Sequence, residues 1–320
     1  MLMFALSIYN AKAQLSKPKF IPSQQSIPFK IIVGEIKGIK GNFDAQYKII
    51  SQQSIEFPYD VILEKDASFC FFINLYISGR DTNVLKYVQI SGKEEEDFYK
   101  KLYSLNKDRS IGNKINIKSF DIEHSNNFQT CLNAIYYMIS QVSNESIQRI
   151  TDTVYHNPYI ATHLKANNLL RIIDSTRLAF LITHDSVLQE IRNNLKFTLS
   201  YSAPYTKYWY KKREKILLEL FNKAIYNSVR FCVITQTLHM PKSGHRKAFL
   251  TYAKLNKLGI ACIYPIYFNK YLNNYFKKSF YCTHPKNPFF FNPKKGQEFS
   301  GKKGAWLLSN NETYYLVISN

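Results

Sequence analysis

The sequence predicts an α/β protein, and three patterns along the chain support this class. Short runs rich in Val, Ile, Phe and Tyr, separated by Gly and Asp, indicate strands in the first ninety residues. Apolar residues at helical spacing fill the middle of the chain, and a strand, loop, helix and strand follow one another towards its end. We therefore divide the chain into a leader (1–28), a strand-rich α/β segment (29–120), a helical segment (121–228) and a C-terminal α/β segment (229–320).

The first residues combine a short apolar stretch with an irregular segment. Met1–Tyr9 is mainly apolar, and Ala11–Ala13 has the small-x-small form of a signal-peptidase site. No Lys or Arg precedes this stretch, which favours a cytoplasmic chain over a cleaved signal peptide. No apolar run reaches the roughly 18 residues that a membrane-spanning helix needs, so we expect no transmembrane segment.

The cysteines favour the same compartment. They are odd in number, widely spaced and mostly within apolar runs, which is typical of free core thiols rather than of a disulfide framework. The five are Cys70, Cys131, Cys232, Cys262 and Cys282. We therefore expect reduced cysteines and a cytoplasmic location.

Four runs in the strand-rich segment have the composition of strands. They are Phe29–Val33, Tyr59–Glu64, Ser68–Ile77 and Val84–Ile90. The acidic run Glu94–Asp97 then indicates the start of a helix, because negative charge is favourable at a helix N-terminus. We prefer this interpretation of the acidic run to a metal site.

The helical segment carries a stripe of apolar residues at i, i+3, i+4 and i+7 spacing over Asn127–Val142. Further helices are predicted over Ile160–Ile173, over Val187–Leu195 and, rich in lysine, over Thr206–Ile225. The last of these interleaves aromatic with basic residues. Such a pattern serves either for stacking on bases or sugars, or for core packing beneath a solvated basic face.

The formal net charge of +20 is concentrated towards the C-terminus. Residues 1–200 carry 23 basic and 19 acidic residues, whereas residues 201–320 carry 20 basic and 4 acidic ones. Such a block attracts polyanions, anionic membrane surfaces or sugar nucleotides through a field that salt screens. Compositional drift explains the block equally well, because Lys outnumbers Arg 34 to 9 and a dedicated nucleic-acid reader favours Arg.

The C-terminal segment opens with the pattern of a partial Rossmann-like βαβ unit. An apolar run at Phe231–Thr235 leads into a loop, and an amphipathic helix is predicted over His245–Leu258. Gly259 can cap that helix, and a second apolar run covers Ile260–Tyr264. A unit of this length predicts two parallel strands that pair with each other, with the helix on one face of the sheet.

Beyond this unit the periodicity is weaker. Asn269–Tyr281 is predicted as a further helix. Ala305–Leu308 and Tyr314–Ile318 are strand-like, and the turn residues between them predict a β-hairpin.

The segment from about residue 230 to 264 resembles the first strand, loop and helix of GT-B glycosyltransferases. In that family a hydrophobic strand runs into a loop with Pro and Gly, and the helix ends in an A-x-x-L-x-x-x-G pattern before the next strand. Ala253, Leu255, Leu258 and Gly259 approximate this ending. The resemblance implies a GT-B fold in this part of the chain and a sugar or glycan as the substrate.

The loop of this unit holds the candidate site. Ser243 and Gly244 stand at the predicted helix N-terminus, where unpaired backbone N–H groups can point at an anion and a ligand can approach the glycine closely. We predict His245 as the catalytic residue, and Ser243, Gly244, Arg246 and His239 as substrate-binding residues, with no metal and no cofactor. A loop with glycine is also common to βαβ units in general, and the dinucleotide and P-loop patterns are absent from it.

The resemblance implies a glycosyltransferase-like protein that acts on a sugar or glycan acceptor. In that fold a second domain holds the nucleotide-sugar donor, yet the residues after Gly259 are too few for it and include only two acidic ones, Glu298 and Glu312. We therefore expect a truncated relative, or one that needs a partner, without glycosyl-transfer activity of its own. The alternative is a non-enzymatic basic protein whose C-terminal third binds nucleic acid or an anionic membrane surface.

Overall fold

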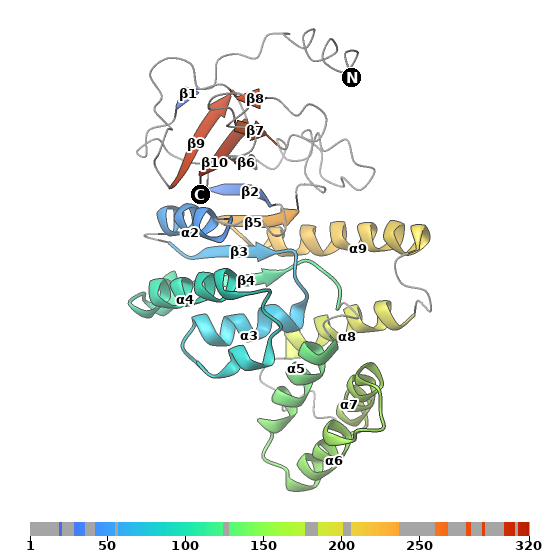
Figure 1. Ribbon diagram of the computed structural model, residues 1–320. Coiled ribbons are helices and arrows are strands. Elements are labelled where there is room, and N and C mark those ends of the chain that lie inside the picture. The colour runs from blue at the N-terminus through green and yellow to red at the C-terminus, as the bar shows by residue number, and fades with distance from the viewer. Residues whose placement is uncertain are drawn as a thin grey trace. The chain divides into compact units, whose positions relative to one another are not determined.

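A computed structural model describes much of the chain in two compact units, Met1–Gln46 with Thr235–Asn320, and Tyr47–Ile234. Parallel strands and helices alternate along the chain, which confirms the predicted α/β class (Figure 1). The described residues are 19–20, 29–35, 42–54, 57–123, 128–176, 185–200, 206–236, 260–267, 280–282, 290–291, 304–310 and 313–319.

The first unit holds a mixed sheet. Its strands run in the order β1 (Lys19–Phe20), β9 (Gly304–Asn310), β10 (Thr313–Ser319), β6 (Ala261–Tyr267) and β2 (Lys30–Glu35). β10, β6 and β2 are parallel, whereas β9 is antiparallel to β1 and to β10. The antiparallel pair of β9 and β10 confirms the hairpin predicted at the end of the sequence. Two short strands continue antiparallel from β6, namely β7 (Phe280–Cys282) and β8 (Phe290–Phe291).

The second unit is built on three parallel strands. They lie in the order β5 (Phe231–Gln236), β3 (Tyr59–Leu63) and β4 (Ile115–Ser119). Consecutive residues of β3 and β5 are buried, from Val61 to Leu63 and from Phe231 to Ile234, as expected for strands covered on both faces. Because all three strands are parallel, their carboxyl ends meet at one edge of the sheet.

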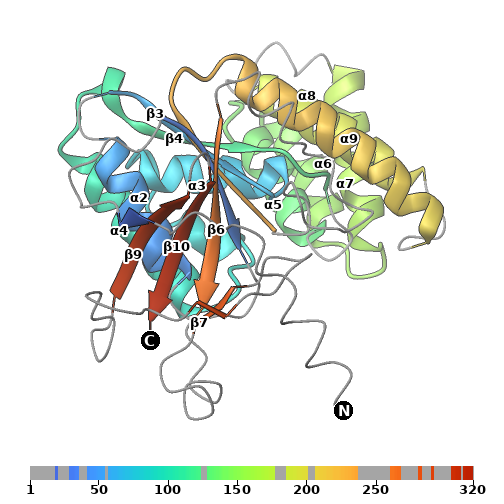
Figure 2. The ribbon, with the colours of Figure 1, turned by 90° about the horizontal axis from the view of Figure 1, so that it is seen from above.

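The helices follow the strands in sequence and cover them. They are α2 (Asn42–Gln53, across the boundary of the units), α3 (Ala67–Ile77), α4 (Lys93–Lys107), α5 (Phe128–Ser140), α6 (Glu145–His156), α7 (Thr162–Thr176), α8 (Asp185–Leu199) and α9 (Lys207–Tyr226), with the short 3-10 helices η1 (Val84–Tyr87) and η2 (Ile111–Asn113). α3 packs against β4, α4, α5 and α8, and α5 packs in turn against α6 and α7. The long helix α9 contacts β4 and runs past α8 (Figure 2).

Most of the local predictions agree with these elements. The strands predicted at 29–33, 59–64 and 231–235 are β2, β3 and β5, and the acidic run opens α4. The helices predicted in the middle of the chain are α5, α7, α8 and α9. The sequence analysis missed α2, β4 and α6.

The strand predicted at Ser68–Ile77 is wrong, because this run forms α3. Asp66 caps the helix by accepting a hydrogen bond from Phe69 N at 2.8 Å. Every residue of α3 except Asn74 is buried, so the run is apolar all round. A continuous apolar run of this kind does not distinguish a buried strand from a buried helix by periodicity.

Two further predictions are corrected. The run Val84–Ile90 contains the 3-10 helix η1 and no strand. β5 and β6, the two strands of the expected βαβ unit, do not pair with each other. β6 lies between β10 and β2, whereas the partner of β5 within the second unit is β3. Apolar composition predicts that each run is a buried strand, but it carries no information about which strand lies beside it. The helix predicted at 245–258 lies outside the described residues.

The outer edge of β4 is closed by two asparagine side chains. Asn106 of α4 accepts a hydrogen bond from Ile115 N at 2.8 Å and donates to Ile115 O at 2.9 Å. Asn74 of α3 does the same with Ile117, at 2.7 Å and 2.6 Å. The two amides satisfy backbone groups that an edge strand would otherwise leave without partners.

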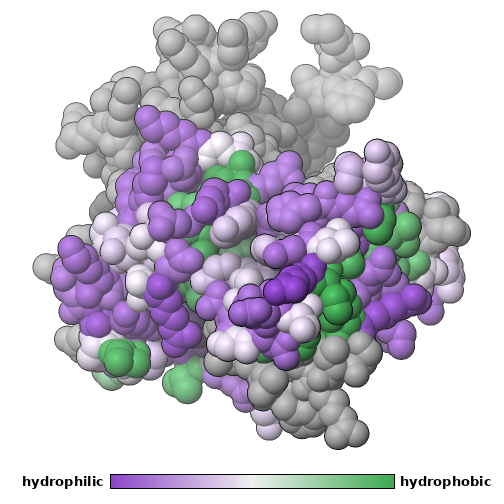
Figure 3. Space-filling model, turned by 90° about the horizontal axis from the view of Figure 1, so that it is seen from below, coloured by the Kyte–Doolittle hydropathy of each residue, from purple (hydrophilic) through white to green (hydrophobic). Residues whose placement is uncertain are grey.

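One face of the described residues is largely hydrophilic. Figure 3 shows one face of the molecule, on which small hydrophobic areas are separated by hydrophilic residues. Among the residues that the structure describes, no helix combines the length and the apolar character needed to cross a bilayer.

Candidate functional site

Four acidic side chains gather at the carboxyl edge of the second unit's sheet. Glu64 and Asp66 follow the end of β3, and Asp121 and Glu123 follow the end of β4. Asp66, Asp121 and Glu123 are 1%, 4% and 0% exposed, and the side chain of Glu64 is 5% exposed. We call these four residues the carboxylate cluster. In open α/β sheets this edge is the usual place for a binding or active site.

Ser68 connects two members of the cluster. Its Oγ lies 2.9 Å from Asp66 Oδ1 and 2.7 Å from Glu123 Oε2, and its backbone N donates to Glu123 Oε1 at 3.1 Å. A hydroxyl group has a single proton, so Ser68 can donate to only one of these carboxyl groups. The arrangement is satisfied when Glu123 is protonated and donates to Ser68, which in turn donates to Asp66.

The environment of Glu123 favours its protonated form. Complete burial raises the pKa of its carboxyl group well above the ordinary value, and the negative charge of Asp66 raises it further. The hydrogen bonds from Ser68 act in the opposite direction but do not offset the burial. The surroundings of Glu123 therefore favour the form that can donate a proton.

Arg213 of α9 balances the negative charge of the other two residues of the cluster, Asp121 and Glu64. Its Nε donates to Asp121 Oδ1 at 3.1 Å, and its Nη2 forms an ion pair with Asp121 Oδ2 and lies 3.6 Å from Glu64 Oε1. Burial lowers the pKa of the guanidinium, but Asp121 and Glu64 raise it by more, so its pKa lies above the ordinary value. Arg213 thus holds positive charge between the ends of β3 and β4, where it balances ionised carboxylates.

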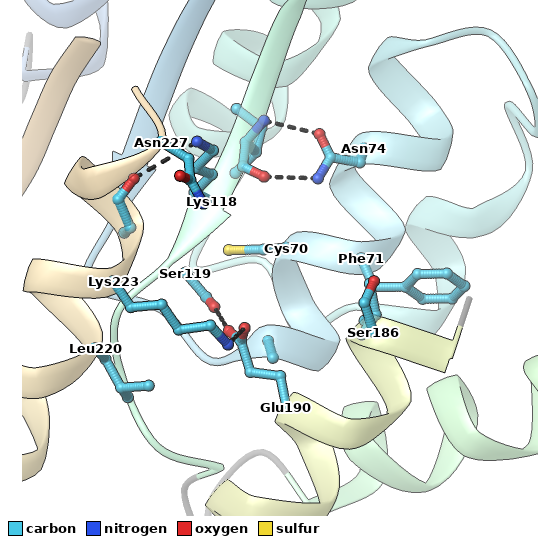
Figure 4. A pocket seen from close by; sticks show the side chains of 14 residues that line it. Cys70, Phe71, Asn74, Lys118, Ser119, Ser186, Glu190, Leu220, Lys223 and Asn227 are labelled. Atoms are coloured by element: carbon cyan, nitrogen blue, oxygen red, sulfur yellow. Dashed lines mark hydrogen bonds and ion pairs between the residues drawn. The ribbon is translucent and has the colours of Figure 1, made fainter. Parts of the chain in front are cut away.

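A cavity of about 390 Å³ lies between α3, β4, α8 and α9 (Figure 4), and its lining does not include the four residues of the cluster. Its polar wall contains Ser119 at the end of β4, which donates a hydrogen bond to Glu190 of α8. Lys223 of α9 donates to the other oxygen of Glu190 at 3.0 Å. Two observations connect the cavity with the cluster. Ser119 precedes Asp121 by two residues along the chain. The negative charge of Glu190 raises the pKa of Glu123, as a smaller contribution than burial and Asp66.

The described cysteines do not supply a nucleophile. Cys70, which lines the cavity, and Cys131 and Cys232 are buried and free, as the sequence predicts. Burial is the first cause that raises the pKa of each thiol, and Asp66 and Glu123 add to it at Cys70 and Cys131. Each thiol is therefore uncharged. Among the residues that the structure describes, no group of three or more His, Cys, Asp or Glu side chains could hold a metal ion.

The site residues predicted from the sequence lie elsewhere in the chain. His239, Ser243, Gly244, His245 and Arg246 all fall within 237–259, outside the described residues, so their proposed roles stay predictions.

The carboxylate cluster was missed by the sequence analysis. Part of its signal was present at β3, where Glu64 is the last residue of the predicted strand Tyr59–Glu64 and Asp66 lies two residues further on. The matching residues Asp121 and Glu123 gave no such signal, because β4 was not predicted and its end was therefore unknown.

Comparisons with known proteins identify the fold but no family. No protein-family model and no curated protein sequence matches the chain. Among solved structures, it is similar to a protein from Bacillus cereus at 14% identity, over 87% of this chain and 76% of that one, with a TM-score of 0.50. It is also similar to a protein described as a succinoglycan biosynthesis protein, at 14% identity over 96% of this chain and 95% of that one, with a TM-score of 0.51. A third similarity, to an erythromycin esterase mutant in its open conformation, has 10% identity over 90% of each chain and a TM-score of 0.47, which supports no inference.

Proposed function

We propose that the chain is an enzyme that acts on a sugar-containing substrate by general acid–base catalysis. The carboxylate cluster carries this proposal. It places four buried acidic side chains at the carboxyl edge of a parallel sheet, in two different surroundings: burial and Asp66 raise the pKa of Glu123, whereas Asp121 and Glu64 lie beside the guanidinium of Arg213.

Glu123 is the proton donor in this proposal. Its neutral carboxyl group is linked through Ser68 to Asp66, which gives a path along which a proton can move. A carboxylic acid that stays protonated near neutral pH can donate a proton to a leaving group, and such a step contributes about 10²–10⁴-fold to a rate.

Glu64 is the proton acceptor, held ionised by Arg213. Asp121 makes the closer contacts with the guanidinium and fixes its position, while Glu64 Oε1 lies at the longer distance of 3.6 Å. We therefore assign Arg213 and Asp121 to positioning, and Glu64 to the abstraction of a proton from water or from an acceptor hydroxyl.

The sugar class rests on one similarity, since the chain shares its fold, over nearly its whole length, with the protein described as a succinoglycan biosynthesis protein. The resemblance of residues 230–264 to GT-B glycosyltransferases adds no support, because β5 and β6 do not pair as that unit requires. Hydrolysis of a glycosidic bond uses a pair of carboxyl groups, one to protonate the leaving oxygen and one to assist the attack. In the glycosyl-transfer form of the proposal, His245 is a further base, and Ser243, Gly244, Arg246 and His239 contact the sugar or glycan acceptor.

A different observation favours the second candidate function, binding of a polyanion. On α9, Trp209 is buried, but Tyr208 is 60% exposed and Lys212 Nζ lies 5.7 Å from the centre of its ring. The neighbouring Lys211 and Lys215 are exposed. An exposed ring among lysines suits a base or a sugar with nearby phosphates.

Activity assays with a panel of substrates test the enzymatic proposal. The full chain is incubated with chromogenic glycosides, oligosaccharides and nucleotide sugars, and product formation is followed by chromatography. Glu64→Gln and Glu123→Gln each remove a proton-transfer group with little change in shape, so we expect kcat to fall by about 10²-fold or more in each. Glu219→Gln is the matched control, because Glu219 is an exposed carboxylate on α9 that pairs only loosely with Lys215 at 4.0 Å.

Turnover that is unchanged in both Glu64→Gln and Glu123→Gln would remove the cluster from the mechanism. No turnover of any member of the panel would contradict the sugar class. A loss of activity in His245→Ala and Arg246→Ala, with nucleotide sugars as the turned-over substrates, would favour glycosyl transfer over hydrolysis.

A further inference from the structure

The cavity between α3, β4, α8 and α9 has the make-up of a small-molecule site. Its volume of about 390 Å³ lies in the range of roughly 300–1,000 Å³ that is usual for ligand pockets. Half of the lining residues are apolar and half are polar. The apolar ones are Ala67, Cys70, Phe71, Ile117, Val187, Leu220 and Ala224, and the polar ones are Asn74, Lys118, Ser119, Ser186, Glu190, Lys223 and Asn227.

The hydrogen-bonding groups that a ligand can use are concentrated on α8 and α9. Asn74 is engaged with the backbone of Ile117, and Lys118 donates to Asp60 at 2.9 Å and to Ser228 Oγ at 2.7 Å. Glu190, in contrast, makes one hydrogen bond with Ser119 and one with Lys223, although a carboxylate has about four acceptor positions. Lys223 is 66% exposed and uses one of its three N–H groups on Glu190. Figure 4 shows Glu190 between Ser119 and Lys223 at the wall of the cavity.

The charges around the cavity cancel in pairs. Lys118 pairs with Asp60, and Lys223 pairs with Glu190. An anionic ligand would be repelled by Glu190, and a cationic one by Lys118 and Lys223. The cavity therefore favours a neutral ligand whose hydroxyl groups donate to Glu190 and accept from Lys223, and whose C–H surface packs on the apolar half.

We infer that this cavity binds a neutral sugar unit, with Glu190 and Lys223 as its principal hydrogen-bonding partners. The inference rests on the proposed function, since it gives the sugar-containing substrate a binding place at Ser119, two residues before Asp121 of the carboxylate cluster. It goes beyond that proposal by naming the neutral class of the sugar and the residues that hold it.

Ligand binding is measured by saturation-transfer NMR and calorimetry on the full chain. The probes are methyl glucoside, methyl galactoside and inositol as neutral polyols, with glucuronate as the anionic and glucosamine as the cationic comparator. We expect the neutral sugars to bind more tightly than both charged ones. Two variants remove the site in different ways: Glu190→Gln removes the carboxylate but keeps an acceptor for Ser119, and Ser186→Trp places a large ring at an exposed lining position.

Each of the two variants is expected to weaken the binding of neutral sugars by about tenfold or more. Glu190→Gln removes a hydrogen bond to a charged group, which is among the stronger ones. Ser186→Trp fills part of the cavity with its ring. Glu219→Gln on α9 is expected to bind as the wild type does. Ser186→Trp changes an exposed residue, so its loss of binding does not depend on the contacts that Glu190 makes within the fold. Circular dichroism confirms that both variants are folded.

The outcomes separate this inference from the proposed function. Sugar binding that persists in Glu64→Gln and is lost in Glu190→Gln supports the cavity, even where no turnover is found. Tighter binding of glucuronate, no binding of any neutral sugar, or binding in both Glu190→Gln and Ser186→Trp that equals that of the wild type would each overturn the inference. Turnover of a sugar substrate together with unaffected kinetics in both cavity variants would leave the catalytic proposal in place and reject this site.

Discussion

The chemistry of single residues in this protein is set by burial and by the nearest charge. Glu123 and Asp121 are two residues apart in the sequence and both are buried, yet one faces Asp66 and Ser68 while the other faces Arg213. A like charge raises the pKa of a carboxyl group, and a guanidinium favours its ionised form. In the proposed mechanism, Glu123 is accordingly the proton donor, whereas Asp121 positions Arg213.

The raised pKa of Glu123 predicts a particular pH dependence of stability. Between the unfolded pKa of about 4.3 and the higher folded pKa, the folded chain binds more protons than the unfolded one, so the free energy of unfolding falls as the pH rises. Glu123→Gln removes this titration, because the amide resembles the protonated acid and still bonds Ser68. We expect the free energy of unfolding of this variant to fall less steeply than that of the wild type above about pH 4.3, by up to about 1.4 kcal/mol per pH unit.

Urea unfolding at several pH values between 4 and 8 measures this difference. Two charged neighbours contribute to the raised pKa of Glu123: Asp66, which Ser68 bridges to Glu123, and, to a smaller extent, Glu190. Glu219→Gln, which removes an exposed carboxylate, is expected to keep the slope of the wild type. Equal slopes in Glu123→Gln and the wild type would show that Glu123 is ionised in the folded chain.

At the scale of elements, two asparagine side chains make the hydrogen bonds that a further strand would make with β4. β4 is the outer strand of the three-stranded sheet in the second unit, and Asn74 and Asn106 bond the N–H and C=O groups of Ile117 and Ile115. This arrangement joins α3 and α4 to the strand that ends in the carboxylate cluster. The position of Asp121 and Glu123 therefore depends on two asparagines from helices.

Asn106→Ala is expected to lower the free energy of unfolding by about 2–4 kcal/mol. Asn106 is fully buried and bonds Ile115 N, Ile115 O and Ile77 O, and each buried group left without a partner costs about 1–3 kcal/mol. Asn74→Ala should cost less, because Asn74 is only half-buried and water can replace part of its bonds. Urea unfolding measures both changes, with Asn193→Ala on the exposed side of α8 as the control. A cost in Asn106→Ala no larger than that in the control would contradict the role of the edge.

At the scale of the whole molecule, the uneven charge is the dominant feature. Residues 201–320 carry an excess of 16 positive charges, compared with 4 in residues 1–200. Part of this excess lies on α9, which also supplies Arg213 to the carboxylate cluster and Lys223 to the cavity. A polyanion and a sugar substrate would thus meet the same helix.

We expect the chain to bind heparin and nucleic acid weakly and with a steep dependence on salt. Retention on a heparin column should disappear at a few hundred millimolar salt, because binding of this kind is driven by counterion release. Replacing Lys211, Lys212 and Lys215 by Gln should lower the eluting salt concentration clearly. Replacing the exposed Lys93, Lys101 and Lys107 of α4 changes the net charge equally but should have a smaller effect. Retention that is insensitive to salt, or equal losses in the two triple variants, would show that the regional charge is not the cause.

The sequence by itself determined the α/β class and the position of most helices and strands. Periodicity reports whether successive residues of one segment are buried, and the amphipathic helices α5 and α9 and the apolar strands β3 and β5 follow from it directly. The regional charge and the free state of the buried cysteines are likewise properties of composition.

Only the tertiary structure decided which segments lie together and which residues form the candidate site. Ser68 and Glu123 are 55 positions apart, and Asp121 and Arg213 are 92 apart, so no local pattern links them. For the same reason the sequence pattern predicts neither the pairing of β6 with β2 and β10 nor the helical conformation of the apolar run in α3. A pattern of burial specifies that a side chain is inside, whereas its neighbours there, and hence its pKa and its chemistry, depend on packing between distant parts of the chain.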